Sequence, residues 1–356
     1  DLPLVASAMD GVVSPETAVL VHKLGGLGVL NLEGIWTRFE DAEEKLELIA
    51  NSSKDEATAL MQEIYETPVK KELIARRVAE IKAEGAVVCG SFTPQSVQEN
   101  YEAALEAGLD ILVIQGTVIS AEHVSTTVEP LNLKEFIAEV PVPTVVGGCA
   151  SYSTGLHLMR TGAVGVLVGV GPGAACTTRG VLGIGVPQAT AIADVAAARS
   201  QHMLETGEYV NVIGDGGMRT GGDISKAIAC GADAVMIGSP LARAKEAPGR
   251  GYHWGMATFH SSLPRGTRVT TVQDGTMEEI LLGPAHENDG TFNLMGALRT
   301  SMATTGYEDI RSFQRAEMMI APALMTEGKK LQTEQAVGMG SNGRAAVSAG
   351  VVVADD

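Results

Sequence analysis

The sequence predicts a closed (β/α)₈ barrel that folds as a single domain. Short apolar, β-rich runs alternate with helical patterns along the chain. These runs are too apolar to leave one face in water, so they indicate a parallel sheet covered by helices. There are eight of them, which is the number that closes such a barrel, and 356 residues suit one α/β barrel.

The predicted strands end in Gly, Ser, Asp or Asn, as strands leading into loops do. They cover residues 4–8, 28–32, 86–92, 110–116, 143–148, 163–170, 210–217 and 234–240. The helical stretches between them open on Ser, Thr or Pro and close on Gly. Clear examples are residues 14–26, 94–108, 153–162 and 220–231.

The chain beyond the eighth strand has weaker periodicity. Residues 249–270 are expected to lie over one face of the barrel as a lid, and two more helices are predicted at 292–304 and 307–316. We therefore expect a barrel domain over residues 1–330, followed by a flexible Gly/Ala-rich tail at 331–356.

Composition excludes several classes of protein. With 26 Lys and Arg against 43 Asp and Glu, the formal charge is −17, which argues against binding to nucleic acid or an anionic membrane. No apolar stretch is long enough to predict a membrane span, and no signal peptide precedes the first strand. The four cysteines form no C-x-x-C pair, so a reduced, cytoplasmic protein is expected. The abrupt start, "DLPLVASAMD", suggests that natural residues precede Asp1.

A lone cysteine follows the sixth predicted strand, in "GVGPGAACTTR" (169–179). Barrel enzymes carry their chemistry on the loops after the strands, so Cys176 lies on the face where chemistry is expected. A cysteine is usually a small buried hydrophobe, as we expect for Cys89 and Cys230, which lie within a predicted strand and helix. Neighbouring hydroxyls and Arg179 instead favour a reactive thiol at Cys176.

The same loop partly matches a dinucleotide-binding fingerprint. Gly169, Gly171 and Ala174 satisfy G-x-G-x-x-A. That fingerprint requires a helix at once and an acidic residue about 20 positions later at a strand end. The nearest acid, Asp194, lies in a helical pattern, so a Rossmann domain is disfavoured.

Phosphate often binds after the seventh and eighth strands of such barrels. The loop "GDGGMRTGGD" offers backbone N–H groups at Gly216 and Gly217, and "IGSPLARA" offers Gly238 and Ser239 at a predicted helix N-terminus. Asp215 either caps a turn or holds a vicinal diol, and the residues alone leave both roles open. The seven histidines show no metal-ligand spacing, so we expect packing or surface roles for them.

Five blocks together resemble the superfamily of IMP dehydrogenases and GMP reductases. They are "ASAMDGV", "GVGPGAACTTR", "GDGGMRTGGD", "MIGSPLARA" and "GYHWGMA", in that order and over nearly the whole chain. The resemblance implies a purine nucleotide 5′-monophosphate (GMP, IMP or XMP) bound across the barrel mouth. It also implies a nicotinamide cofactor, NADPH or NAD, and a homotetramer.

The resemblance also assigns roles to individual residues. Cys176 would attack C2 of the purine, and Thr178 would help to protonate the leaving amine together with a glutamate. The implied nucleotide contacts are Ser7, Met9, Asp215, Gly217, Gly238, Ser239, Gly255 and Met256. Gln115 and Thr117 would contact the cofactor, and the carbonyls of Gly171, Gly173 and Cys176 resemble a K⁺ site. Ala174 replaces a serine that usually binds phosphate.

Two missing features point to the reductase. IMP dehydrogenases usually insert a pair of CBS domains between the second barrel helix and the third strand. Residues 31–87 carry only charged helical sequence, which leaves no room for that insertion. Dehydrogenases also need an Arg-Tyr pair on a flap to activate water, and only "TFHSSL" separates "GMA" from "PRG" here. The resemblance therefore favours reduction of GMP by NADPH to IMP and ammonia.

Two departures from the family keep other readings open. Arg265 lies where the family has its glutamate, with Glu278 or Glu279 as substitutes, and Gln115 replaces an aspartate. The alternatives are an IMP dehydrogenase, which converts IMP and NAD to XMP, and a purine-nucleotide sensor with negligible turnover.

Overall fold

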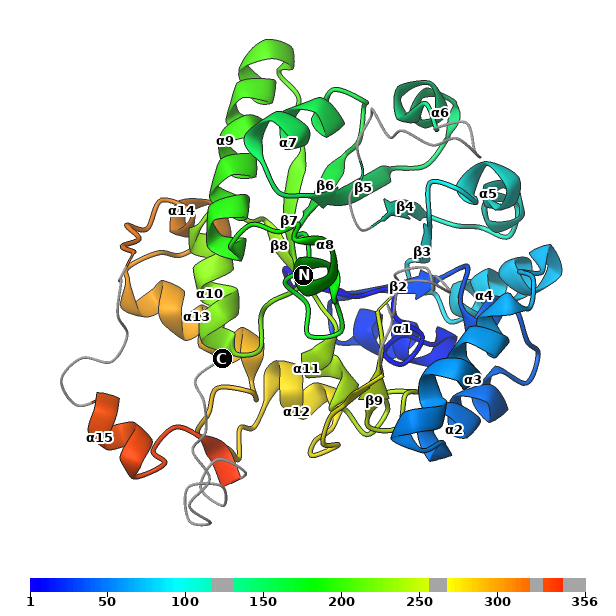
Figure 1. Ribbon diagram of the computed structural model, residues 1–356. Helices are drawn as coiled ribbons and strands as arrows, with labels where there is room; N and C mark the ends of the chain where they lie inside the picture. Colours follow the sequence, from blue (N-terminus) through cyan, green and yellow to red (C-terminus); the bar gives the residue numbers. More distant parts are fainter. Residues whose placement is uncertain (117–118, 120–130, 256–267, 321–328, 342–356) are drawn as a thin grey trace.

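The computed structural model describes residues 1–116, 119, 131–255, 268–320 and 329–341. Its centre is a closed barrel of eight parallel strands in chain order (Figure 1), which confirms the predicted fold and all eight predicted strands. The strands are β1 Leu4–Ala6, β2 Leu27–Asn31, β3 Cys89–Phe92, β4 Ile111–Gln115, β5 Thr144–Cys149, β6 Gly165–Val168, β7 Asn211–Asp215 and β8 Ala234–Ile237. Pairing of Val5 with Met236 joins β1 to β8 and closes the barrel.

Helices surround the barrel (Figure 1). The helices that lie between strands are α1 Pro15–Lys23, η1 Ile35–Thr37, α2 Ala42–Asn51, α3 Lys54–Glu66, α4 Lys71–Ala83, α5 Val97–Glu106, α6 Leu133–Glu139, α7 Tyr152–Met159, α8 Thr178–Leu182, α9 Gln188–Thr206 and α10 Gly221–Ala229. After β8 come α11 Ser239–Ala242, α12 Met277–Leu282, α13 Leu294–Thr304, α14 Ile310–Phe313 and α15 Lys329–Glu334. Two of the predicted start signals are confirmed, because Ser14 and Thr220 form capping boxes at α1 and α10. The other two differ, since α5 begins at Val97 without a side-chain cap and α7 is capped by Ser151.

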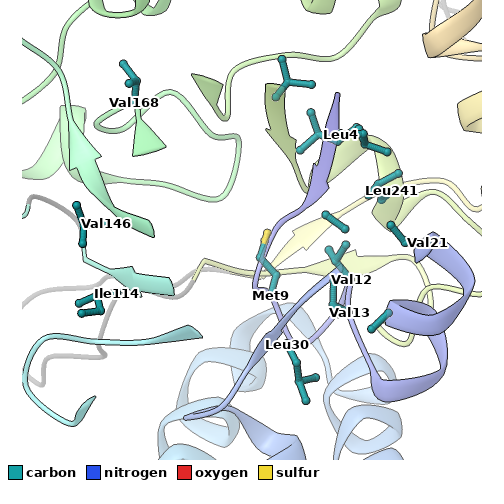
Figure 2. Close-up of a cluster of buried hydrophobic side chains, with 14 of the residues drawn as sticks. Leu4, Met9, Val12, Val13, Val21, Leu30, Ile114, Val146, Val168 and Leu241 are labelled. Atoms are coloured by element: carbon teal, nitrogen blue, oxygen red, sulfur yellow. The ribbon is translucent and has the colours of Figure 1, made fainter. Parts of the chain in front are cut away.

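The barrel interior is a packed core. Each strand contributes one buried side chain to it: Val5, Val29, Cys89, Val113, Val145, Leu167, Ile213 and Met236. Cys89 therefore packs as a hydrophobe, as expected. A second, larger core lies between the strands and the helices, where Leu4, Val21 and Leu241 meet (Figure 2). The two cores hold the strand ends rigidly, which fixes the loops that follow them.

Two elements stand outside the regular barrel. Helices α2 and α3 lie between β2 and α4, and α4 is the helix that packs against α1 and α5. The short strands β9 (Tyr252–His253) and β10 (Val269–Thr270) pair antiparallel. Residues 256–267 of the predicted lid lie outside the described residues, as do 342–356 of the tail. In the described ranges, no helix is both long and apolar enough to cross a membrane.

Candidate active site

The loop after β6 presents Cys176 beside a threonine hydroxyl. The thiol donates a hydrogen bond to Thr178 Oγ1 at 3.1 Å. Cys176 is partly exposed, whereas Thr178 is fully buried at the first turn of α8. The thiols of Cys89 and Cys149 are buried, and burial raises their pKa values because it disfavours the thiolate, to about 12 for Cys149. Of the three, only Cys176 combines exposure with a polar partner.

Arg179 braces this loop. Its guanidinium donates to the carbonyls of Val170, at 3.2 Å, and Val186, at 2.5 Å. It therefore ties the two ends of the loop together, a role that differs from the direct support of a thiolate that the sequence suggested. The loop also contacts the end of β7, because a Cβ at Gly169 would overlap the carbonyl oxygen of Asp215.

Gln188, at the start of α9, fixes the same junction. Its Nε2 donates to the carbonyls of Val168, at 2.6 Å, and Asp215, at 3.1 Å. Gln188 Oε1 is buried and lacks a hydrogen-bond partner in the described part of the chain. Sequence reasoning missed this residue, because a glutamine opening a helix carries no motif. It joins the end of β6 to the end of β7 and so sets where the Cys176 loop begins.

Asp215 and Gln115 meet across the barrel mouth. Gln115, at the end of β4, donates from Nε2 to Asp215 Oδ2 at 3.1 Å. Burial raises the pKa of Asp215 to about 7, and the hydrogen bond from Gln115 opposes this rise. Gln115 Oε1 is also buried and has no partner among the described residues. The arrangement places one acceptor carboxylate and one acceptor carbonyl at the centre of the mouth.

The loops after β1 and β8 come together beside this pair. A Cβ at Gly238 would lie 2.6 Å from Met9 Sδ and 3.5 Å from Ser7 Cβ, so only glycine leaves room there. The backbones are linked too, because Ser7 N–H donates to Ile237 O at 3.0 Å. The structure thus brings together three residues that the sequence assigned to the nucleotide pocket.

Ser239 has a histidine partner that the sequence did not reveal. Its Oγ lies 2.8 Å from Nε2 of His253, on β9. Burial lowers the pKa of His253 to about 4, so the imidazole is neutral near pH 7. His253 Nδ1 is buried without a hydrogen-bond partner in the described ranges. When the neutral imidazole donates from Nε2 to Ser239 Oγ, the hydrogen of the Ser239 hydroxyl can be donated to another acceptor.

The anticipated anion-binding backbone needs two corrections. Gly216 N–H donates to Met236 O at 3.0 Å, so it is used by the barrel itself. The helix after β8, α11, spans only Ser239–Ala242, so it cannot supply an appreciable helix dipole. Gly217 has φ +77°, and a Cβ there would lie 2.9 Å from Pro172, so the β7 loop touches the Cys176 loop. That contact requires glycine.

Gly255 reaches the nucleophile loop from the other side. A Cβ on it would lie 3.3 Å from Ala175 O, one residue before Cys176. Two other predicted site residues, Met256 and Thr117, lie outside the described residues.

The implied cation site is made of backbone. Gly171 adopts φ +75°, and Gly173 O accepts a hydrogen bond from Cys176 N–H at 2.9 Å. A carbonyl has a second lone pair, so this bond is compatible with a cation ligand. Within the described part of the chain, no cluster of three His, Cys, Asp or Glu side chains forms a metal site.

The substitute glutamates sit on α12. Glu279 completes the capping box of that helix, where its Oε2 accepts from Thr276 N–H at 2.7 Å. Glu278 is exposed. Glu279 is thus already used by its own helix, which weakens its candidacy as the acid that assists Thr178.

Comparison with known proteins identifies the family. The model of the IMP dehydrogenase/GMP reductase domain matches residues 1–330. An uncharacterized oxidoreductase from Mycolicibacterium smegmatis is 46% identical over 329 residues, which are 90% of this chain and 88% of that protein. The inosine-5′-monophosphate dehydrogenase of Cryptosporidium parvum is 32% identical over 255 residues, 70% of this chain and 61% of that protein.

A solved structure supports the same family assignment. The crystal structure of an IMP dehydrogenase/GMP reductase-like protein from Corynebacterium glutamicum matches with a TM-score of 0.84 and 44% identity, over 90% of this chain and 85% of that one. The fold, the Cys176 loop and these matches agree with one another: the chain is an oxidoreductase that belongs to the IMP dehydrogenase/GMP reductase family.

Proposed function

We propose that this protein is a GMP reductase, which converts GMP and NADPH to IMP, ammonia and NADP⁺. The observation that carries the proposal is the pair formed by Cys176 Sγ and Thr178 Oγ1, 3.1 Å apart. The pair lies on a loop packed against the end of β7, where Asp215 stands. A nucleophile, a hydroxyl that can relay a proton and a diol acceptor thus share one barrel mouth.

The nucleotide would lie with its ribose between these loops. Asp215 accepts from the ribose hydroxyls, which are donors that an ionised carboxylate binds well. Gly217 N–H, Gly238 N–H and the Ser239 hydroxyl bind the phosphate, with His253 orienting the hydroxyl. Ser7, Met9, Gly255 and Met256 border the base in this proposal. Because α11 is short, the phosphate depends on these individual donors.

The chemistry needs two steps at one carbon. Cys176 Sγ forms a bond to C2 of GMP. The bond from C2 to the exocyclic amino nitrogen then breaks, and ammonia is released. The departing nitrogen takes up a proton that Thr178 Oγ1 relays, and assistance of this kind is worth roughly 10²- to 10⁴-fold in rate. A nicotinamide held near Gln115 would supply the hydride that C2 needs. Cys176 is the group that leaves C2 as a thiolate when the C2–S bond breaks.

Gln115 fits a role in cofactor binding. Its Nε2 is engaged by Asp215, but its buried Oε1 lacks a partner among the described residues, so it can accept from a hydroxyl of the nicotinamide ribose. Thr117, two residues later, is proposed as a second contact. We propose K⁺ at the carbonyls of Gly171, Gly173 and Cys176, where it would hold the loop in shape.

The reductase is preferred because the residues between Gly255 and Arg268 contain no tyrosine and hence no Arg-Tyr pair. Hydrolysis at C2, which an IMP dehydrogenase requires, would lack that means of activating water. By family likeness we also propose a cytoplasmic homotetramer, with residues 1–330 as one catalytic domain and 331–356 as a tail.

Absorbance at 340 nm tests the proposal. With GMP and NADPH, a fall in absorbance with release of ammonia is expected. A rise with IMP and NAD would instead identify a dehydrogenase. No change with either pair, despite measurable nucleotide binding, would identify the sensor alternative and contradict both reactions.

A further inference from the structure

Helices α2 and α3 occupy the stretch between β2 and α4, and they contact the chain on both sides of residues 256–267. One contact involves Trp254, just before that segment, and the other involves Arg268, just after it. Trp254 is buried and Arg268 is partly buried, and both side chains donate to named acceptors on these helices.

The first contact is a directed chain of hydrogen bonds. Trp254 Nε1 donates to the hydroxyl of Tyr65, near the end of α3, at 2.8 Å. The Tyr65 hydroxyl in turn donates to Asp10 Oδ2, in the loop after β1. An indole N–H can only donate, so the tyrosine hydrogen must point to Asp10, and the direction of the chain is fixed.

The acceptor at the end of this chain is itself held firmly. Asp10 is completely buried, and its carboxylate also accepts from Ile35 N–H, at 2.9 Å, and Asn31 Nδ2, at 3.2 Å. Burial raises the pKa of Asp10, and burial together with the neighbouring Asp10 raises that of Tyr65 well above its ordinary value. Tyr65 therefore stays a protonated donor over the physiological range.

The second contact is an arginine cap. Arg268 donates to the carbonyl of Ile49 and to both the carbonyl and the hydroxyl of Ser52, the latter two at 3.0 Å. These carbonyls lie at the C-terminal end of α2, where backbone acceptors lack helical partners. The guanidinium also stacks on the Tyr252 ring, with 4.1 Å to the centroid.

The tyrosine chain leads directly to the nucleophile loop. Trp254 is followed by Gly255, which is packed so closely on Ala175 that a Cβ would lie 3.3 Å from its carbonyl oxygen. Ala175 precedes Cys176. Displacement of the indole would therefore move the backbone that borders the thiol.

We infer that α2 and α3 are anchor helices, and that Tyr65 and Arg268 are positioning residues that hold Trp254 and Gly255 against the Cys176 loop. The inference rests on the proposed role of Cys176 as the nucleophile. Neither residue touches the reacting atoms. Their effect is to fix one wall of the site, so that the thiol faces a defined space.

The test uses the substitution Tyr65→Phe and a control with matched chemistry. In Tyr209→Phe the same hydroxyl is lost from a similar bond, since Tyr209 donates to Asp233 Oδ1 at 2.5 Å. Tyr209 and Asp233 precede β7 and β8, so they lie at the other end of the barrel. Both variants lose one tyrosine–carboxylate bond, but only one of them loses the link to Trp254.

The readout is the rate at which iodoacetamide alkylates Cys176, followed by mass spectrometry of its peptide. Loss of one buried hydrogen bond should loosen the wall and raise the rate by about fivefold in Tyr65→Phe. An unchanged rate in Tyr65→Phe, or an equal rise in Tyr209→Phe, would overturn the inference. This assay needs no substrate. If the wild-type protein fails to reduce GMP, the proposed function is refuted, but the alkylation rates still test the inference.

A second pair of variants covers the case in which Tyr65→Phe does not fold. Arg268→Met should also speed alkylation of Cys176. Its control is Arg199→Met, because Arg199 likewise stacks on a tyrosine ring, at 5.0 Å, and donates to the carbonyl of Gly231, which follows a helix. Arg199 also pairs with Asp233 Oδ2 at 2.6 Å, so the control removes an additional ion pair at the other end of the barrel. Equal rates of Cys176 alkylation in the two arginine variants would contradict the positioning role of Arg268 and the anchor helices.

Fluorescence shows whether the perturbation reaches the indole. The chain has two tryptophans, so Trp36→Phe leaves Trp254 as the only source of tryptophan emission. In that background, Tyr65→Phe should shift the emission maximum, whereas Tyr209→Phe should not. In turnover, kcat should fall by about fivefold in Tyr65→Phe, while the Kd for the nucleotide stays within about twofold. A shift in Kd alone would contradict a positioning role.

Discussion

The hydrogen bond between Gln115 and Asp215 gives the sharpest quantitative prediction. Burial holds the pKa of Asp215 at about 7, and the Gln115 amide limits the rise by donating to the ionised carboxylate at 3.1 Å. Replacing Gln115 by Met removes the donor and keeps much of the side-chain volume. A hydrogen bond to a charged group is worth about 1.5–3 kcal/mol, which corresponds to a further rise of about one to two pH units.

The sign of the effect on binding follows from the chemistry of the diol. Ribose hydroxyls donate to the ionised carboxylate, so nucleotide affinity should increase as pH rises through the pKa of Asp215. The midpoint should lie near pH 7 in the parent protein and about one to two units higher in Gln115→Met. The nucleotide phosphate also titrates near pH 6, but it does so identically in both proteins.

Calorimetric titration with GMP between pH 5.5 and 9.5 measures this midpoint. A Cys176→Ala background prevents reaction, so that binding alone is observed. Gln188→Met is the control, because Gln188 donates to the main-chain carbonyl of Asp215 and not to its carboxylate. An unchanged midpoint in Gln115→Met, or an equal shift in Gln188→Met, would show that the Gln115 amide does not stabilise the ionised Asp215.

Three further predictions follow from the site. Thr178→Val should lower kcat for GMP reduction by about 10²-fold or more with little change in nucleotide Kd, and stopped-flow absorbance would disprove the proton relay if kcat were retained. Limiting iodoacetamide should label Cys176 before Cys149 and Cys89, whose raised pKa values keep them protonated, and peptide mapping that finds Cys89 modified first would contradict this order. The lowered pKa of His253, about 4 against 6.5, means that the native state binds fewer protons between those values. The unfolding free energy should therefore decrease by up to about 3 kcal/mol as pH falls from 6.5 to 4, and urea titrations should show a flatter profile in His253→Phe.

The barrel was readable from the sequence because its signals are local. Each strand is a short apolar run, and helices α1 and α10 carry their own starts in the capping boxes of Ser14 and Thr220. The position of Cys176 followed from counting strands, because the loop after the sixth strand must emerge at the mouth. These features depend on spacing and composition within about 20 residues.

The contacts that shape the site were not readable in this way. Gln115 and Asp215 are 100 residues apart and meet because the ends of the non-neighbouring strands β4 and β7 open into the same barrel mouth. Tyr65 and Trp254 are 189 residues apart, and residues 31–87 showed only charged helical patterning. The Gly216 N–H looked available in the sequence, but in the folded barrel it donates to Met236 O on the neighbouring strand β8.

The central claim is a bond between Cys176 Sγ and C2 of the purine, and mass spectrometry tests it directly. GMP is added without NADPH, the mixture is quenched in acid, and the peptide containing Cys176 is analysed. We expect an adduct on this peptide whose mass equals that of GMP plus the thiol minus ammonia. It should form together with one equivalent of ammonia and be absent in Cys176→Ala. Reduction of GMP by NADPH in Cys176→Ala, or turnover by the parent protein with no adduct trapped at Cys176, would contradict it.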